Sequence, residues 1–213
     1  FESTIYSQRG LVVRQERRIE PANASNASSV ATNYWYDEVD RVIAEWAPNS
    51  PTAKIAYDGL GRPKVAYLTD RRGDAAPSVS GSHADAKSIS DDYIVAQTSY
   101  TYRGAGSSQP VNGGVLELVT VRRRSHDAGA TTGALAGSAA VASYSGTVFD
   151  AADRPIRRVD FGTNDTSNGL FVTGSAPSTP IGTLPNTGEL VWTTSYNDRG
   201  LVDTETDPEG VVT

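Results

Sequence analysis

Cysteine and methionine are both absent from this chain of 213 residues. The lack of cysteine excludes disulfide bonds, thiolate catalysis and zinc sites with cysteine ligands. The sequence has no apolar run near the roughly 18 residues that a membrane-spanning helix needs. It also contains none of the G-x-S-x-G, H-E-x-x-H or phosphate-binding glycine motifs. We therefore predict that the protein is not an enzyme, and that it uses no cofactor and no metal.

Positive charge is scarce as well. Lys and Arg number 19 against 25 Asp and Glu, which gives a net charge of −6, so the chain is not suited to binding nucleic acid. The basic triplet at 122–124 is more typical of a solvated strand end than of a binding patch. Tyr is abundant by contrast, with 10 residues against 4 Phe, and Tyr suits half-buried positions on a β-sheet. The composition favours an all-β protein.

One heptapeptide pattern recurs along the chain: an aromatic residue, Asp, two variable residues, Gly or Asp, Arg, and then Pro or Val. It occurs as YDEVDRV at 36–42, YDGLGRP at 57–63 and FDAADRP at 149–155. Two looser copies, YSQRGLV at 6–12 and YNDRGLV at 196–202, resemble each other more than they resemble the rest. The segment YRG, which begins at Tyr102, is a decayed further copy. Several copies in one chain indicate a repeat protein.

Each copy has the chemistry of a tight turn between two β-strands. Asp58 can accept a hydrogen bond from the backbone two residues further on, and Gly61 tolerates a positive φ. Apolar and polar residues alternate in the segments before the turns, as in 141–149 and 190–196. The pattern therefore predicts successive antiparallel hairpins, with turns at 58–61, 150–153 and 197–200.

The residues of the repeat motif are expected to have structural roles. We expect the aromatic side chains to pack across neighbouring strands, and each Arg to stack on a neighbouring ring or to pair with an Asp one repeat away. We predict no catalytic, cofactor-binding or metal-binding residues. The residues that we assign to the structural repeat motif are Tyr36, Asp37, Arg41, Tyr57, Asp58, Gly61, Arg62, Phe149, Asp150, Arg154, Tyr196 and Gly200.

Long segments of small and polar residues separate the hairpins, and we predict loops there. Helical signals are poor, because only 38–47 has a helix-like spacing and the repeat motif includes its first residues. No boundary separates two cores, so residues 1–213 are predicted to form a single continuous repeat region. The predicted loop insertions are 20–33, 73–92, 104–113, 127–140 and 162–188.

The repeated segments resemble the YD repeat of Rhs proteins, teneurins and the shell-forming subunits of insecticidal toxin complexes. The D-P-x-G segment at 207–210 also resembles one that often follows a YD hairpin. The resemblance covers most of 5–70 and 145–213. It implies hairpins that join edge to edge into a sheet, which winds into a hollow shell around a toxic polypeptide or, in teneurins, carries extracellular recognition surfaces.

The resemblance implies a structural scaffold segment of a secreted or cell-surface protein. Its partners would be flanking repeats or other copies of the polypeptide, and an enclosed polypeptide cargo. The insertions are longer than is typical, and the family's aspartyl self-cleavage segment is missing. We therefore expect this chain to be part of a larger polypeptide, and to oligomerise through its open sheet edges when expressed alone. The alternative is an adhesion or carbohydrate-binding module that binds surface glycans, for which Trp35, Trp46 and Trp192 are the residues of interest.

Several short motifs are interpreted as loop chemistry. Ser125, His126 and Asp127 are the residue types of a catalytic triad, but neighbours in sequence cannot form its geometry, and His83 lies in a small polar segment. The residues from Asn164 resemble the start of a calcium loop, but Ser175 stands where the bidentate Glu belongs. The remaining motifs are an adhesion-type tripeptide at Arg72, Gly73 and Asp74, and glycosylation sequons at Asn23, Asn26 and Asn164.

Overall fold

The computed structural model describes residues 2–19, 28–70, 83–104, 114–126, 129, 131–164, 177 and 189–213. These residues form twelve strands in one sheet, one short α-helix and one 3-10 turn, which confirms the predicted all-β fold. The strands are β1 (Glu2–Tyr6), β2 (Val12–Ile19), β3 (Ser28–Tyr36), β4 (Val42–Trp46), β5 (Thr52–Tyr57), β6 (Pro63–Thr69), β7 (Ile94–Tyr102), β8 (Leu116–Arg124), β9 (Ala140–Phe149), β10 (Pro155–Thr163), β11 (Leu190–Tyr196) and β12 (Val202–Thr206). The helix is α1 (His83–Lys87), and the 3-10 turn is η1 (Gly137–Ala139).

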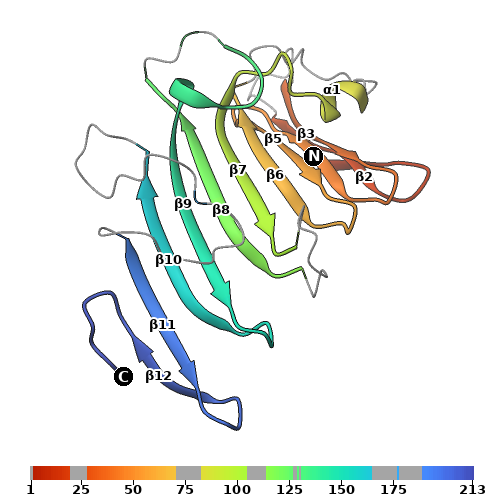
Figure 1. Ribbon diagram of the computed structural model, residues 1–213. Helices are drawn as coiled ribbons and strands as arrows, with labels where there is room; N and C mark the ends of the chain where they lie inside the picture. The colour runs from red at the N-terminus through yellow and green to blue at the C-terminus, as the bar shows by residue number, and fades with distance from the viewer. Residues whose placement is uncertain are drawn as a thin grey trace. The chain divides into compact units, whose positions relative to one another are not determined.

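Each strand pairs with its neighbours in the sequence, so the strand order in the sheet is the chain order from β1 to β12 (Figure 1). The β1/β2, β3/β4, β5/β6, β9/β10 and β11/β12 pairs are antiparallel hairpins. Within these hairpins the pairing follows from the short turns, because a chain that reverses within a few residues pairs with the strand it has just left. The predicted succession of hairpins is therefore present.

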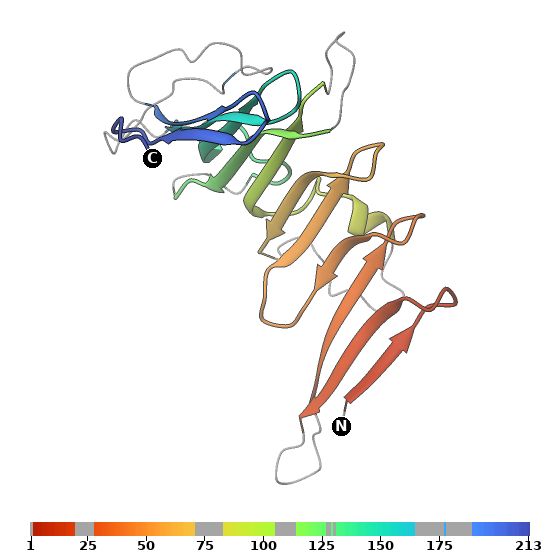
Figure 2. The ribbon, with the colours of Figure 1, turned by 90° about the horizontal axis from the view of Figure 1, so that it is seen from below.

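The chain divides into two compact units. Unit 1 comprises Phe1–Gln97 and Arg124–Ala139, and unit 2 comprises Thr98–Arg123 and Ala140–Thr213. In unit 1 the hairpins β1/β2, β3/β4 and β5/β6 follow one another in chain order (Figure 2). That residues 1–213 form a single continuous repeat region stays a prediction.

In unit 1 the helix α1 packs on β4 and β5. Its Ala86 joins the buried Ile43 and Ala44, and the half-buried Trp35 and Tyr57 pack against this cluster. The helix is only five residues long, too short to be stable by propensity alone, so this packing stabilises it. Asp85 in its first turn and Lys87 in its last turn complement the helix dipole.

In unit 2 the strands supply the core themselves. Strand β9 alternates between buried and exposed residues, with Ala142 and Tyr144 on the buried face. Leu118, Val159 and Phe161 from β8 and β10 complete the cluster. The alternation predicted for 141–149 is present, because a strand with one buried face turns every second side chain into the core.

The structure corrects several predicted loop boundaries. Strand β3 begins at Ser28, inside the segment 20–33, and α1 lies inside 73–92. The serine and alanine residues at the start of β3 give little indication of a strand, but the ladder from Ser28 to Asn33 along β2 fixes them in the sheet. The segment 38–47, with its helix-like spacing, contains strand β4. The segment 127–140 contains η1 and the first residue of β9, and β10 extends to Thr163 inside 162–188. Most of 104–113 and 162–188 lies outside the described residues.

Candidate functional site

The hairpin turns are the most distinctive feature of the described chain, and the turn at 58–62 has the complete geometry. The Asp58 carboxylate accepts the backbone N–H groups of Leu60 and Arg62, both at 2.9 Å. The Gly61 N–H donates to the Asp58 carbonyl at 3.0 Å, and Gly61 has a φ of 84°. This is a type I turn followed by a left-handed residue and a bulge, as the register shift between Ala56 and Tyr57 shows.

The same turn recurs in both units. The first turn residue is Asp37, Asp58, Asp150 or Asp207, and Asn197 and Ser7 replace Asp in the two looser copies. In every case its side-chain oxygen accepts the N–H groups of the third and fifth turn residues. The fourth residue has a positive φ throughout, and it is Gly10, Asp40, Gly61, Asp153, Gly200 or Gly210. The turns expected at 58–61, 150–153 and 197–200 are all present.

Where the fifth turn residue is Arg, it pairs with the Asp of its own turn. The Nε of Arg62 donates to the second Asp58 oxygen at 2.7 Å, and Arg41 and Arg154 contact Asp37 and Asp150 in the same way. Of the two interactions expected for these arginines, stacking on a neighbouring ring is observed for two of them. Each of the three arginines forms an ion pair with the Asp of its own turn.

The stacked arginines connect consecutive hairpins. In unit 1 the Arg41 guanidinium lies 4.5 Å from the centre of the Tyr57 ring, and in unit 2 Arg154 lies 4.4 Å from that of Tyr196. The guanidinium also lies over the glycine of that next turn, since a Cβ on Gly61 would stand 2.9 Å from Arg41 Nη1. A Cβ on Gly200 would stand 3.3 Å from Arg154 Nη1. Glycine at this position therefore gives both the positive φ and the space for the arginine.

The tyrosines of the motif bind back to the preceding hairpin. The hydroxyls of Tyr36, Tyr57 and Tyr196 donate to the carbonyls of Val12, Val42 and Pro155 at 2.8–2.9 Å. Each acceptor is the first residue after the preceding turn. A tyrosine at this position therefore fixes its own hairpin against the one before it. Phe149, which has this position in the β9/β10 hairpin, has no hydroxyl and cannot donate such a hydrogen bond.

The charge pairs hold the turn carboxylates ionised. The backbone N–H and the guanidinium of Arg62 lower the pKa of Asp58 below its ordinary value, and Arg154 does the same to the pKa of Asp150. Burial acts in the opposite direction on the pKa of Asp37, but the N–H and guanidinium of Arg41 outweigh it and the pKa is lowered. The three aspartates are therefore charged, and serve as fixed acceptors in the turns.

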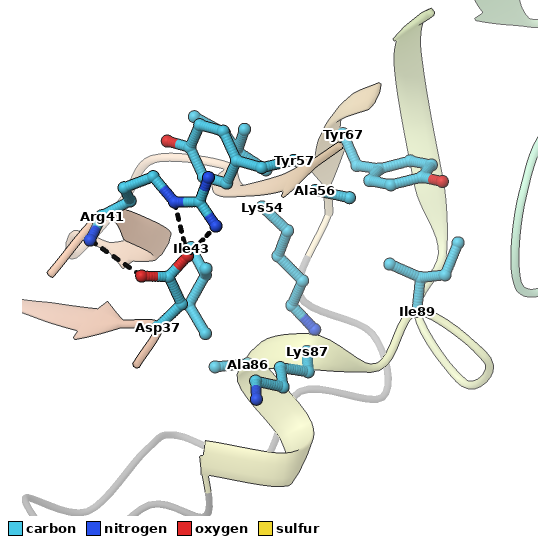
Figure 3. Close-up of a pocket in the computed structure, with 11 residues that line it drawn as sticks. Asp37, Arg41, Ile43, Lys54, Ala56, Tyr57, Tyr67, Ala86, Lys87 and Ile89 are labelled. Carbon is cyan, nitrogen blue, oxygen red and sulfur yellow. Dashed lines mark hydrogen bonds and ion pairs between the residues drawn. The ribbon is translucent and has the colours of Figure 1, made fainter. Parts of the chain in front are cut away.

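A cavity of about 210 Å³ lies beside this contact in unit 1, between the sheet and α1 (Figure 3). Arg41 and Tyr57 line one side, Tyr67 and Ile89 another, and Lys54 extends from β5 toward the helix. Its lining holds no group of catalytic carboxylates or histidines.

Lys54 is the most buried cation of the described chain, with a side chain 5% exposed. Its ammonium donates to the Asp92 carboxylate at 2.6 Å and to the carbonyls of Asp85 and Ser88, both at 2.9 Å. Three donors thus meet three acceptors, which is what a buried ammonium requires. Sequence reasoning missed this pair, because Asp92 lies 38 residues further along the chain.

Arg124 is a second residue that sequence reasoning missed. It belongs to the basic triplet interpreted as a solvated strand end, but its guanidinium lies 3.8 Å from the centre of the Tyr93 ring. It donates to the carbonyls of Ile94 at 2.7 Å and Thr131 at 2.9 Å. These contacts fix the segment around Thr131 within unit 1. Only the charge of Arg124 was visible in the sequence, and its partners come from distant segments.

The other short motifs fall mostly outside the described residues. Asn23, Asn26, Asp127 and the tripeptide at 72–74 are among them, while the side chain of His126 is exposed. The Asn164 side-chain oxygen accepts the N–H of Ala142 at 2.6 Å. In the part of the chain that the structure describes, no three His, Asp or Glu side chains are placed to hold a metal ion. Among those same residues, no helix is long and apolar enough to cross a membrane.

No protein-family model matches the chain, and no curated protein does. Solved structures of toxin complexes are similar at low identity. A crystal structure of TcdB2-TccC3-Cdc42 has 14% identity and a TM-score of 0.27 over 98% of this chain and 11% of that one. TcdB2-TccC3 without its hypervariable C-terminal region has 10% identity and a TM-score of 0.27, over 100% and 12%. A Photorhabdus luminescens Tc holotoxin pore has 14% identity and a TM-score of 0.26, over 97% and 11%.

The chain thus spans about a tenth of the proteins in these structures (11%, 12% and 11%). Similarity at this level defines neither the family nor the function of this chain.

Proposed function

We propose that the chain is a structural scaffold without catalytic activity, a β-sheet that is extended by adding one hairpin to the next. One observation carries the proposal. The same contacts between consecutive hairpins occur independently in both units: an arginine of one turn stacks on the tyrosine of the next, and that tyrosine donates back to the preceding hairpin. Contacts confined to nearest neighbours are the property that allows a repeat array to be extended.

In its finer form, the proposal is that this scaffold is a segment of a secreted or exported shell that encloses a polypeptide cargo. The repeated YD-type motif supports it, together with turns whose side chains are used for contacts within and between hairpins. The adhesion alternative has no comparable support, because exposed tryptophans on loops would favour it. Trp35, Trp46 and Trp192 lie on β3, β4 and β11.

The scaffold proposal can be tested on the chain as it stands. Arg41→Ala should raise amide exchange in the turns at 37–41 and 58–62 together, because the guanidinium contacts both. Arg157→Ala on β10, an exposed arginine outside the turns, is the control and should leave both turns unchanged. An increase confined to 37–41 would contradict coupling between hairpins.

Activity and enclosure need separate measurements. A screen with ester, glycoside and phosphoester substrates should give no turnover, and turnover that disappears with His126→Ala would overturn the scaffold proposal. For enclosure, limited proteolysis of the full-length polypeptide should leave an internal cargo segment intact until the repeat turns are disrupted. A cargo cleaved as fast as a free peptide would rule out the shell while leaving the scaffold in place.

A further inference from the structure

Three turns carry an arginine directly before the positive-φ glycine. They are Arg9 with Gly10, Arg103 with Gly104 and Arg199 with Gly200, and the glycine φ values are 78°, 79° and 77°. These arginines differ from Arg41 and Arg154, which stand after the positive-φ residue and pair with the aspartate of their own turn. The position before the glycine directs the guanidinium elsewhere.

Two of these three arginines bind the turn of the next hairpin. In unit 1, Arg9 pairs with Asp40 and approaches the Glu38 carbonyl at 3.5 Å. In unit 2, Arg103 pairs with Asp153 at 2.9 Å and donates to the Asp150 carbonyl at 3.1 Å. The two contacts have the same composition: one aspartate at the fourth turn position and one backbone carbonyl of the same turn.

The identity of the fourth turn residue, Asp or Gly, thus corresponds to which arginine of the preceding hairpin contacts it. Asp40 and Asp153 have φ values of 68° and 59°, unusual for residues other than glycine, and each binds an arginine that precedes a glycine. Gly61 and Gly200 instead lie under an arginine from the fifth position. Aspartate and glycine at this position therefore accept different arginines from the hairpin before.

Arg199 precedes a positive-φ glycine, as Arg9 and Arg103 do, but in the part of the chain that the structure describes no aspartate of a following turn contacts it. Its side chain is exposed, and among the described residues its guanidinium has no hydrogen bond and no ion pair. Its turn has Leu201 at the fifth position, as the turn of Arg9 has Leu11, so it lacks the arginine that would stack over a glycine. The two turns share Arg, Gly and Leu at their third, fourth and fifth positions.

The backbone after β12 already fixes the register of the next position in the sheet. After the turn at Asp207, Thr213 pairs with Glu205 of β12 through two backbone hydrogen bonds of 2.9 Å. In this register, a residue four positions beyond Thr213 would face Leu201. Extending the register of the Arg14 and Asn33 pair by three residues places Tyr36 opposite Leu11, beside the Val12 carbonyl that accepts its hydroxyl. A following hairpin would thus bring its tyrosine and turn to Arg199 as the second hairpin does to Arg9.

We infer that Arg199 is a docking residue for a further β-hairpin whose turn carries aspartate at its fourth, positive-φ position. The inference rests on the proposed scaffold function and names the partner that this end of the sheet selects. A hairpin with glycine at that position would leave Arg199 without its carboxylate, and so would be discriminated against.

The test extends the full chain by a copy of residues 33–46, attached directly to Thr213. The fourth added residue then copies Tyr36, and the added turn carries the counterpart of Asp40. Amide exchange should slow in β12 and in the turn at 197–201 relative to the unextended chain. Arg199→Ala should reverse part of this protection, by about two- to fivefold, as expected for an exposed ion pair. Replacing the added aspartate by glycine should have the same effect.

A charge exchange separates a specific pair from a general structural effect. Arg199→Asp combined with arginine in place of the added aspartate should recover the protection that either change alone removes. Arg9→Ala in the same protein is the positive control and should raise exchange in the turn at 37–41. Protection that is independent of Arg199, or an added hairpin that never protects β12, would overturn the inference. The scaffold function would survive either result, because its test concerns Arg41 in the unextended chain.

Discussion

Unit 1 is held by two different kinds of contact, one at the turns of its hairpins and one on the sheet face beneath α1. At the turns, the contacts are partly exposed and their parts recur from hairpin to hairpin. Beneath the helix, one ammonium is fully surrounded and forms a buried ion pair with Asp92. At the turns, stability is thus distributed over many weak contacts, each of which contributes little. The helix instead depends on the single buried pair of Lys54 and Asp92, and removing either partner leaves a buried charge uncompensated.

The largest effect is expected at the buried pair. Lys54→Ala should destabilise the α1 region by about 3–5 kcal/mol, because it leaves a buried carboxylate without its cation. Native-state hydrogen exchange at α1, β4 and β5 measures this locally. Lys87→Ala, an exposed lysine on the same helix, is the matched control and should change stability by less than about 0.5 kcal/mol. Equal effects of the two variants would remove the distinction between the two kinds of contact.

Tyr57 belongs to both regions, since it packs on the cluster with Ile43 and stacks under Arg41. Tyr57→Ala should cost about 2–4 kcal/mol of local stability, and Tyr57→Phe, which loses only the hydrogen bond to Val42, about 1 kcal/mol. Tyr6→Ala is the control at the equivalent place of the first hairpin, where the side chain is 61% exposed and the effect should be small. Unchanged exchange around Tyr57→Ala would show that the repeat motif is a coincidence of composition.

The positive-φ position gives a smaller effect. Gly61→Ala should cost about 1–2 kcal/mol, because an L-residue is strained at a φ of 84° and its Cβ displaces the Arg41 guanidinium. Gly59→Ala, two residues earlier in the same turn with nothing within 4 Å of its Cβ, should lie within about 0.5 kcal/mol of the parent. Denaturation curves of the pair measure the difference. A neutral Gly61→Ala would mean that the turn tolerates rearrangement.

Acid should weaken the aspartate turns and spare the asparagine turn. Because the pKa of Asp58 and of Asp150 is lower in the folded chain than in the unfolded one, their stabilisation is present above the ordinary range near pH 4. It is lost as the pH falls through the lowered folded-state pKa. NMR titration should therefore shift the amide signals of Leu60 and Arg62 below about pH 4. Those of Arg199 and Leu201, which donate to Asn197, should stay constant. Titration of both sets would assign the change to general unfolding.

The turns could be predicted from the sequence because their chemistry is local. Asp58 and Gly61 act within the turn that contains them, so the motif by itself indicates which residue accepts the backbone hydrogen bonds and which adopts a positive φ. The partners of Lys54, Arg9 and Arg124 could not be predicted, because each lies in a different hairpin or segment. The helix α1 was missed for a related reason. Five residues give too little periodicity for a helix to be recognised, and only the sheet beneath them stabilises it.

The tyrosine hydroxyls that donate to the preceding hairpin have a kinetic consequence. A contact of this kind needs only residues that are already synthesised when the tyrosine emerges, since Val42 lies 15 residues before Tyr57 and Val12 lies 24 before Tyr36. The two contacts of unit 1 are shorter in sequence than that of Tyr196 with Pro155, which spans 41 residues. Short-range contacts favour rapid folding, and a chain whose contacts all point to earlier residues can fold in the direction of its synthesis. Each hairpin would then serve as the template for the next, so an unfinished chain would expose its latest strand, in addition to the edge strand β1, to aggregation.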